Sequence, residues 1–139
     1  MAIRFHRARE HALHPLHAVL LGGAFSLFLG TALSDLAYNA SYFIQWTNFG
    51  SWMNAGGLVF AGLALIWAIV DLIRFRGATV PYFLVLLAAW VLGFIGSLVH
   101  ARDAWGAMPA ALILSILTTL LVIAGIVIGL IGLRMGERA

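Results

Sequence analysis

The chain has 139 residues, of which 63% are hydrophobic and 9% are charged, and its formal net charge is +3. Soluble domains are about 45–50% apolar and about 25% charged, so this composition indicates a membrane protein. The sequence contains no cysteine, which excludes a disulfide, a c-type haem, a thiolate iron–sulfur cluster and a catalytic thiol.

The first sixteen residues are rich in arginine and histidine, so we expect residues 1–16 to form a cytoplasmic leader outside the lipid. The first predicted span covers 17–38, and Pro15 suits the first turn of its helix. The apolar run is long enough to cross the membrane, so we do not expect a cleavable signal. At 1.5 Å per residue, Asp35 lies about 30 Å beyond Pro15, near the outer surface.

Aromatic side chains crowd residues 39–51, which connect the first span to a second predicted span at 52–73. This composition is typical of an aromatic belt at the membrane interface, so we expect an outer interfacial loop. The segment is long enough to hold a short helix in the membrane plane. An aromatic lid over a cofactor or a quinone ring is the alternative interpretation.

Two further spans are predicted at 80–99 and 110–133, and short connections join them to their neighbours. Short connections place consecutive helices side by side and antiparallel. We therefore expect an all-α, integral membrane four-helix bundle with up-down-up-down topology, in which residues 1–139 form a single transmembrane domain.

The basic residues are all arginines, and their placement predicts the orientation of the bundle. Three arginines precede the first span, two follow the second span and two follow the fourth span, whereas only Arg102 falls in an outer connection. The positive-inside rule therefore places both termini in the cytoplasm. Because the arginines flank apolar spans and form no basic stripe, we expect no nucleic acid partner.

The outer connections gather the strongest candidates for a functional site. Ionisable groups near a span are costly in lipid, so each needs a partner or a role. An imidazole beside carboxylates and an indole suits coupled proton and electron transfer, which favours a b-type haem or a quinone near the outer face. In the alternative interpretation, Asp35 pairs with His100 or Arg102 and only ties helix ends together. The candidate cofactor-binding residues are Asp35, His100, Arg102, Asp103 and Trp105.

The inner side carries a second group, formed by His14, His17 and Asp71. The two histidines lie three residues apart on one helix face, and Asp71 is a potential third ligand of a metal ion. Alternatively, the histidines lie at the headgroup level and cap the helix start. A haem held by two histidines of one subunit is disfavoured, because His100 lies at the opposite membrane face.

Four segments of the chain form a recognisable pattern: His14-Pro15-Leu16-His17, Ser34-Asp35-Leu36, Ser97 to Trp105, and Pro109 followed by Leu114-Ser115. With these segments the chain resembles the domain-of-unknown-function family 2231, which comprises small bacterial four-span membrane proteins. Some members of this family are joined to Rieske or cytochrome c domains, so the resemblance implies electron transfer or quinone contact. Many members end the fourth span with a Trp-x-Gly-Gly run and a histidine-bearing tail, whereas this chain has Ile128 to Arg134 there.

The sequence therefore predicts a redox-associated accessory or anchor subunit of the bacterial inner membrane, without stand-alone enzymatic activity. Its expected partners are the lipid bilayer and either a redox protein or a second copy of the chain. Small residues at helical spacing, such as Gly125 and Gly129, fit internal packing and homodimerisation equally well. A non-catalytic structural or assembly protein is the main alternative, and a small transporter or metal-binding membrane protein is a weaker one.

Overall fold

The computed structural model describes residues 14–75 and 79–137, and every regular element in these ranges is a helix. The predicted leader therefore lies outside the described residues except for its last three positions. Four helices are long and apolar enough to cross a membrane, which makes the protein a multi-pass membrane protein. The helices are α2 (Pro15–Ser41), α3 (Ile44–Phe75), α4 (Val80–His100), α5 (Ala104–Ala107) and α6 (Ala110–Glu137).

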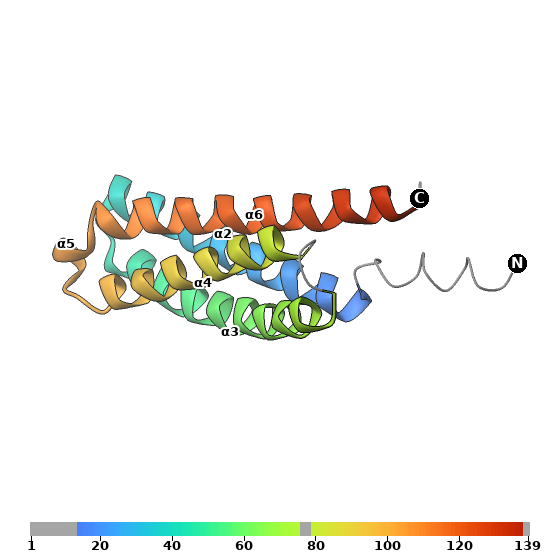
Figure 1. Cartoon of the computed structure of the whole chain (residues 1–139). Helices are drawn as coiled ribbons and strands as arrows, with labels where there is room; N and C mark the ends of the chain where they lie inside the picture. The colour runs from blue at the N-terminus through green and yellow to red at the C-terminus, as the bar shows by residue number, and fades with distance from the viewer. Residues whose placement is uncertain (1–13, 76–78, 138–139) are drawn as a thin grey trace, which may run out of the picture.

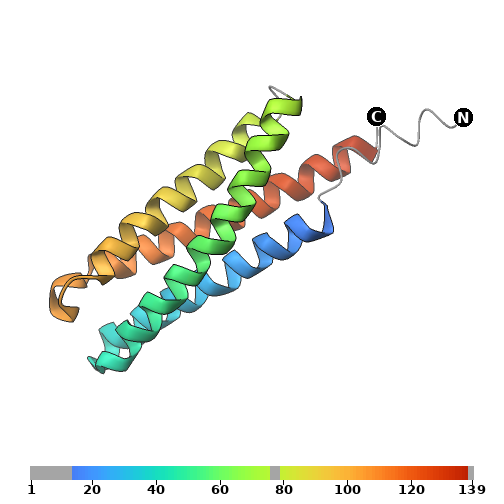
Figure 2. The same ribbon diagram turned by 90° about the horizontal axis from the view of Figure 1, so that it is seen from below.

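The four long helices form the predicted up-down-up-down bundle (Figures 1 and 2). Going round the bundle, α2 packs against α3, α3 against α4, α4 against α6, and α6 against α2. Helices α2 and α4 therefore lie diagonally opposite each other and run in the same direction. We call the end that carries α5 the α5 end, and the opposite end, where α2 begins, the His17 end.

The limits of α2 follow from its terminal residues. His14 is the N-cap, and its Nδ1 accepts a hydrogen bond of 3.3 Å from the backbone N–H of Leu16. Pro15 occupies the first turn, where a missing N–H costs no helical hydrogen bond. After Ser41 the chain turns at Tyr42, whose φ is 56°, and the Tyr42 N–H donates to the Tyr38 carbonyl.

The structure corrects the prediction of an outer loop over 39–51. Helix α2 continues to Ser41 and α3 begins at Ile44, so only Tyr42 and Phe43 connect the two helices. The residues expected to form a short helix in the membrane plane are instead the first turns of α3. Their polar side chains lower the local hydropathy, which suggested a loop, but they do not break a helix. Helix α3 has 32 residues and is about 48 Å long, which exceeds a hydrocarbon core of about 30 Å.

The core of the bundle is almost entirely apolar in one half, whereas the other half holds most of the buried polar side chains. Towards the His17 end and the centre, the buried side chains are almost all apolar, and they include Leu21, Phe28, Ala64, Leu86 and Val122. Towards the α5 end, a small apolar cluster of Val99, Ala107 and Ala111 is buried together with many polar side chains. The buried polar side chains there are Thr31, Ser34, Asp35, Thr47, Asn54, His100, Ser115, Thr118 and Thr119. This uneven distribution places the polar chemistry near one membrane surface.

Several glycines allow helices to approach closely within the bundle. Phe28 fills the centre, and a Cβ atom added at Gly57 or Gly93 would lie 2.9 or 3.1 Å from its ring. A Cβ atom at Gly125 would lie 3.0 Å from Leu86. These small residues therefore serve packing inside the chain, as one of the two interpretations of the glycine pattern predicts.

Candidate functional site

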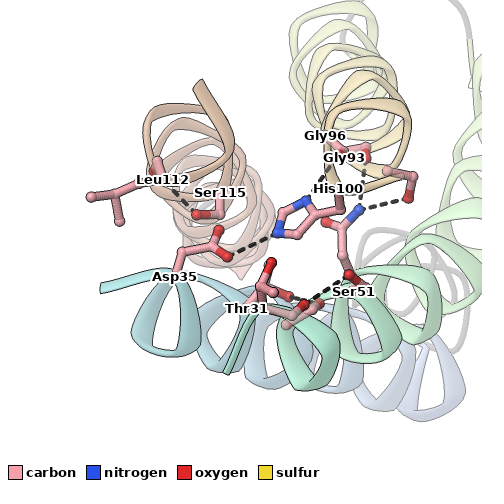
Figure 3. Close-up of polar contacts among 12 residues, drawn as sticks. Thr31, Asp35, Ser51, Gly93, Gly96, His100, Leu112 and Ser115 are labelled. Carbon is pink, nitrogen blue, oxygen red and sulfur yellow. Dashed lines mark hydrogen bonds and ion pairs between the residues drawn. The ribbon is translucent and has the colours of Figure 1, made fainter. Parts of the chain in front are cut away.

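Asp35 and His100 form a hydrogen-bonded pair in the polar half of the bundle (Figure 3). The distance between His100 Nε2 and Asp35 Oδ1 is 2.8 Å, and the two side chains are 2% and 0% exposed. Asp35 comes from α2 and His100 from the last turn of α4, so the pair joins the two diagonally opposite helices. The prediction that Asp35 pairs with either His100 or Arg102 is thereby confirmed for His100.

The hydrogen bonds of His100 define where its protons lie. Its Nδ1 is 2.8 Å from the carbonyl oxygen of Gly96, and because a carbonyl only accepts, Nδ1–H is the donor. The hydrogen bond between Nε2 and Asp35 Oδ1 requires one further proton, which either atom can carry. In both arrangements the pair has zero net charge and shares one proton, a favourable state for groups buried in a membrane.

One carboxylate oxygen of the pair has no partner. Asp35 Oδ2 is buried and has no hydrogen-bond partner among the described residues. Buried polar atoms normally have such a partner, so Oδ2 is the atom of the pair that is available for a further donor. Figure 3 shows Ser115 of α6 pointing towards the same part of the core.

The backbone of α3 passes close beside the pair at Gly50. A Cβ atom at this position would lie 3.2 Å from Asp35 Oδ1 and 3.7 Å from His100 Nε2. The hydroxyl of Thr31 lies 3.4 Å from the Gly50 carbonyl and also donates to the Leu27 carbonyl at 2.9 Å. Gly50 therefore allows three helices to converge on the pair without a side chain between them.

Asn54 extends the polar site towards the centre of the bundle. Its Nδ2 lies 2.9 Å from the Gly93 carbonyl and 2.7 Å from Ser97 Oγ, so its two N–H groups join α3 to α4. Sequence reasoning missed Asn54, Thr31 and Gly50. An amide inside an apolar span is costly without partners, which is the signal that points to Asn54.

The other outer candidates do not gather around the pair. Arg102 and Asp103 are exposed, and Trp105 is 76% exposed. Trp105 instead stacks on Tyr42, with ring centroids 5.4 Å apart and planes inclined by 13°. The five predicted residues therefore separate into a buried pair and an exposed group on the connection between α4 and α6.

The His17 end holds a different cluster. His17 is 1% exposed, and its Nε2 is hydrogen-bonded to the hydroxyl of Tyr82 on α4. The rings of His14 and His17 lie beside Trp67, with centroid distances of 4.9 and 5.7 Å. His14 is exposed and caps α2, as one interpretation predicts, whereas His17 is buried in the bundle and does not lie among lipid headgroups.

The proposed metal ligands are not brought together. Within residues 14–75 and 79–137, no group of three or more His, Asp, Glu or Cys side chains is placed to hold a metal ion. The predicted set of His14, His17 and Asp71 is therefore not assembled, because His17 turns into the core and bonds to Tyr82.

His100 is not placed to bind a haem iron. Axial ligation needs a free ring nitrogen, but Gly96 and Asp35 engage both nitrogens of His100. His17 bonds to Tyr82 through Nε2 and lies at the opposite end of the bundle, about 27 Å away along the helix axis, so it cannot share a haem with His100. No step of the chemistry is therefore assigned to haem.

Comparison with protein-family models, curated proteins and solved structures gives no match for this chain. The resemblance to family 2231 stays a prediction. The functional argument therefore depends on the geometry of the bundle.

Proposed function

We propose that the chain is a membrane-embedded accessory or anchor subunit of a redox assembly, in which Asp35 and His100 exchange a proton with a quinone near the outer face. The observation that carries the proposal is the buried pair itself, which shares one proton and leaves Asp35 Oδ2 without a partner. The proposal assigns no stand-alone enzymatic activity to the chain.

A quinone takes up protons together with electrons when it is reduced, and it releases them when it is oxidised. Groups that serve it must therefore carry a proton that can be given and recovered. Histidine is the side chain that most often transfers protons near neutral pH, and a carboxylate partner orients its ring. The Asp35–His100 pair has this composition and lies in the half of the bundle that holds most of the other buried polar side chains.

Each neighbouring group has a defined task in this proposal. The Gly96 carbonyl holds Nδ1–H and fixes the plane of the His100 ring. Asp35 Oδ1 shares the mobile proton with Nε2, and Oδ2 receives the hydrogen bond of an incoming donor. Gly50 lets the backbone of α3 pass beside the pair without a side chain.

The remaining components follow from the predicted orientation. The bacterial inner membrane would supply the quinone, and a partner protein would supply or remove the electrons. With both termini in the cytoplasm, the α5 end faces the outside, where a soluble redox domain can reach it.

Quinone that remains bound during extraction tests this proposal. Wild type, Asp35→Asn and His100→Gln are extracted with native lipid into polymer-bounded nanodiscs, and quinone per protein is measured by chromatography. We expect an enrichment over bulk lipid that falls about tenfold in either variant, which corresponds to about 1.4 kcal/mol. Asp71→Asn at the His17 end is the matched control and retains the enrichment. Wild-type discs without enrichment, or an unchanged Asp35→Asn, would contradict the proposal.

A structural or assembly protein is the second candidate function. It is favoured by the hydrogen bonds that join α2 to α4 at both ends of the bundle, through His17 with Tyr82 and through Asp35 with His100. In this case Asp35→Asn and His100→Ala lower the unfolding temperature in detergent, and wild-type nanodiscs carry no excess quinone.

A further inference from the structure

The Tyr42–Trp105 stack lies outside the Asp35–His100 pair. Tyr42 follows α2, which carries Asp35, and Trp105 lies in α5, directly after the helix that carries His100. The stack therefore connects the continuations of the same two diagonal helices, one level closer to the membrane surface. Its two residues are 60% and 76% exposed, whereas the side chains of the pair are at most 2% exposed.

Tyr42 adopts a backbone conformation that a tyrosine rarely occupies. Its φ of 56° and ψ of 18° lie in the left-handed region, which glycine usually fills at the end of a helix. A side chain in this conformation is unfavourable unless its contacts compensate. The Tyr42 ring stacks on Trp105 and makes an edge contact with Tyr38, at a centroid distance of 6.2 Å.

Residues 101–109, which we call the strap, are held firmly on only one side. Ala107 is completely buried against Val99 and Ala111, so it anchors the strap to α4 and α6. On the other side, the Trp105 ring contacts Tyr42 through the exposed stack. Next to Trp105, a Cβ atom added at Gly106 would meet no other atom within 4 Å.

We propose that the strap is a gate over the Asp35–His100 pair, with the Tyr42–Trp105 stack as its latch. This inference rests on the proposed function, because it assigns the control of proton access to the same pair. With the stack closed, the pair is shielded from water at the α5 end. When the stack opens, the strap swings on its Ala107 anchor and water or a quinone headgroup reaches His100.

Deuterium exchange at the Cε1 position of histidine tests the gate without any quinone. This exchange needs water at the imidazole, and mass spectrometry of peptides measures it separately for each histidine. We expect exchange at His100 to be about tenfold faster in Trp105→Ala and in Tyr42→Gly, which removes the ring and relieves the positive φ. Exchange at buried His17 stays unchanged and serves as the internal reference.

Two controls separate the latch from general loosening. Tyr42→Phe keeps a ring for the stack, and Trp52→Ala removes another exposed tryptophan, 75% exposed, from α3. Both should exchange His100 at the wild-type rate. Equal acceleration in Trp52→Ala, or no acceleration in either latch variant, would overturn the proposal.

The absence of native cysteine allows the latch to be closed covalently. In the double variant Tyr42→Cys/Trp105→Cys, a thiol-specific crosslinker joins only these two positions. We expect fast His100 exchange before crosslinking and the wild-type rate afterwards, and continued fast exchange would overturn the gate. Histidine exchange is measured without quinone, so the two proposals can fail separately. A negative exchange result does not affect the quinone-binding result, and the absence of bound quinone does not affect the exchange result.

Discussion

Two hydrogen bonds fix the orientation of the His100 ring at the residue scale. One goes to the Gly96 carbonyl of its own helix, and the other goes to Asp35 on the diagonal helix. The first bond assigns a proton to Nδ1, and consequently only Nε2 and Asp35 are left to exchange one. The chemistry of the site therefore depends on the distance between these two side chains, and the backbone of Gly50 passes close beside both of them.

Gly50→Ala tests whether the Asp35–His100 pair can accommodate a side chain at position 50. The new Cβ would lie 3.2 Å from Asp35 Oδ1, so the carboxylate must shift by a few tenths of an ångström. Overpacking of this kind costs about 1–3 kcal/mol, and we expect a loss in this range in the free energy of unfolding, measured by denaturant titration in mixed micelles. Gly96→Ala is the matched control, since its Cβ would lie no closer than 3.7 Å to a neighbour. Equal losses in the two variants would contradict the role of Gly50.

The sequence is sufficient to select Asp35 and His100, because ionisable groups at the ends of apolar spans need partners. It could not separate His100 from Arg102 as the partner, since both follow the third span within one turn. The helix ends at His100, which directs its ring inward, whereas Arg102 lies in the turn and is exposed. The sequence could show that Asn54 needs a hydrogen-bond partner inside its span. It could not show that the partners are Gly93 and Ser97, because these depend on the rotation of α3 against α4.

At the scale of elements, α2 and α4, together with the residues that directly follow them, are joined across the bundle at three levels. His17 with Tyr82, Asp35 with His100, and Tyr42 with Trp105 follow one another from the His17 end to the α5 end. Neighbouring helices make most of the contacts in the bundle, and these three side-chain contacts link the diagonal helices to each other.

Tyr82→Phe tests the contact at the His17 end. Removing the hydroxyl leaves His17 Nε2 without its partner, and Nδ1 is already buried without one among the described residues. A lost hydrogen bond of this kind costs about 1 kcal/mol, which should appear as a lower free energy of unfolding in mixed micelles. Tyr42→Phe, at an exposed position, should leave the stability unchanged. A Tyr82→Phe protein as stable as the wild type would show that this bond does not hold the helices.

Helix existence was predictable, but one helix limit was not. The apolar runs predict four spans because about 20 apolar residues are needed to cross the hydrocarbon core. The first turns of α3 contain Gln45, Thr47 and Asn48, which lower the hydropathy and suggest a loop. Their helical conformation comes from packing beside α2, where Gly50 and Thr47 are buried, and local composition does not contain that information.

At the scale of the whole molecule, the buried polar side chains are concentrated in one half of the bundle. The layer around Phe28, Leu86 and Val122 is apolar, so the described residues form no continuous polar path between the Asp35–His100 pair and His17. A transporter needs polar groups along its path, and this arrangement disfavours the transporter alternative. A site that exchanges protons with one membrane surface needs only the polar half.

The orientation of the bundle is testable with single cysteines, because the native chain has none. With both termini in the cytoplasm, Asp103→Cys should react with a membrane-impermeant maleimide in intact cells. Ala139→Cys should react only after the membrane is permeabilised. The reverse pattern would place the Asp35–His100 pair at the cytoplasmic surface and would exclude an outer redox partner.

The most direct test of the central claim is the ¹⁵N NMR signal of His100 in nanodiscs, recorded while a short-chain ubiquinol is added. A quinol that exchanges a proton with the pair should shift the Nε2 resonance of His100 in a saturable way. The resonances of His17 at the other end should stay in place, and Asp35→Asn should abolish the shift. A His100 signal that does not respond in the folded wild-type protein, or a His17 signal that moves equally, would contradict the assignment of Asp35 and His100 as the proton-exchange site.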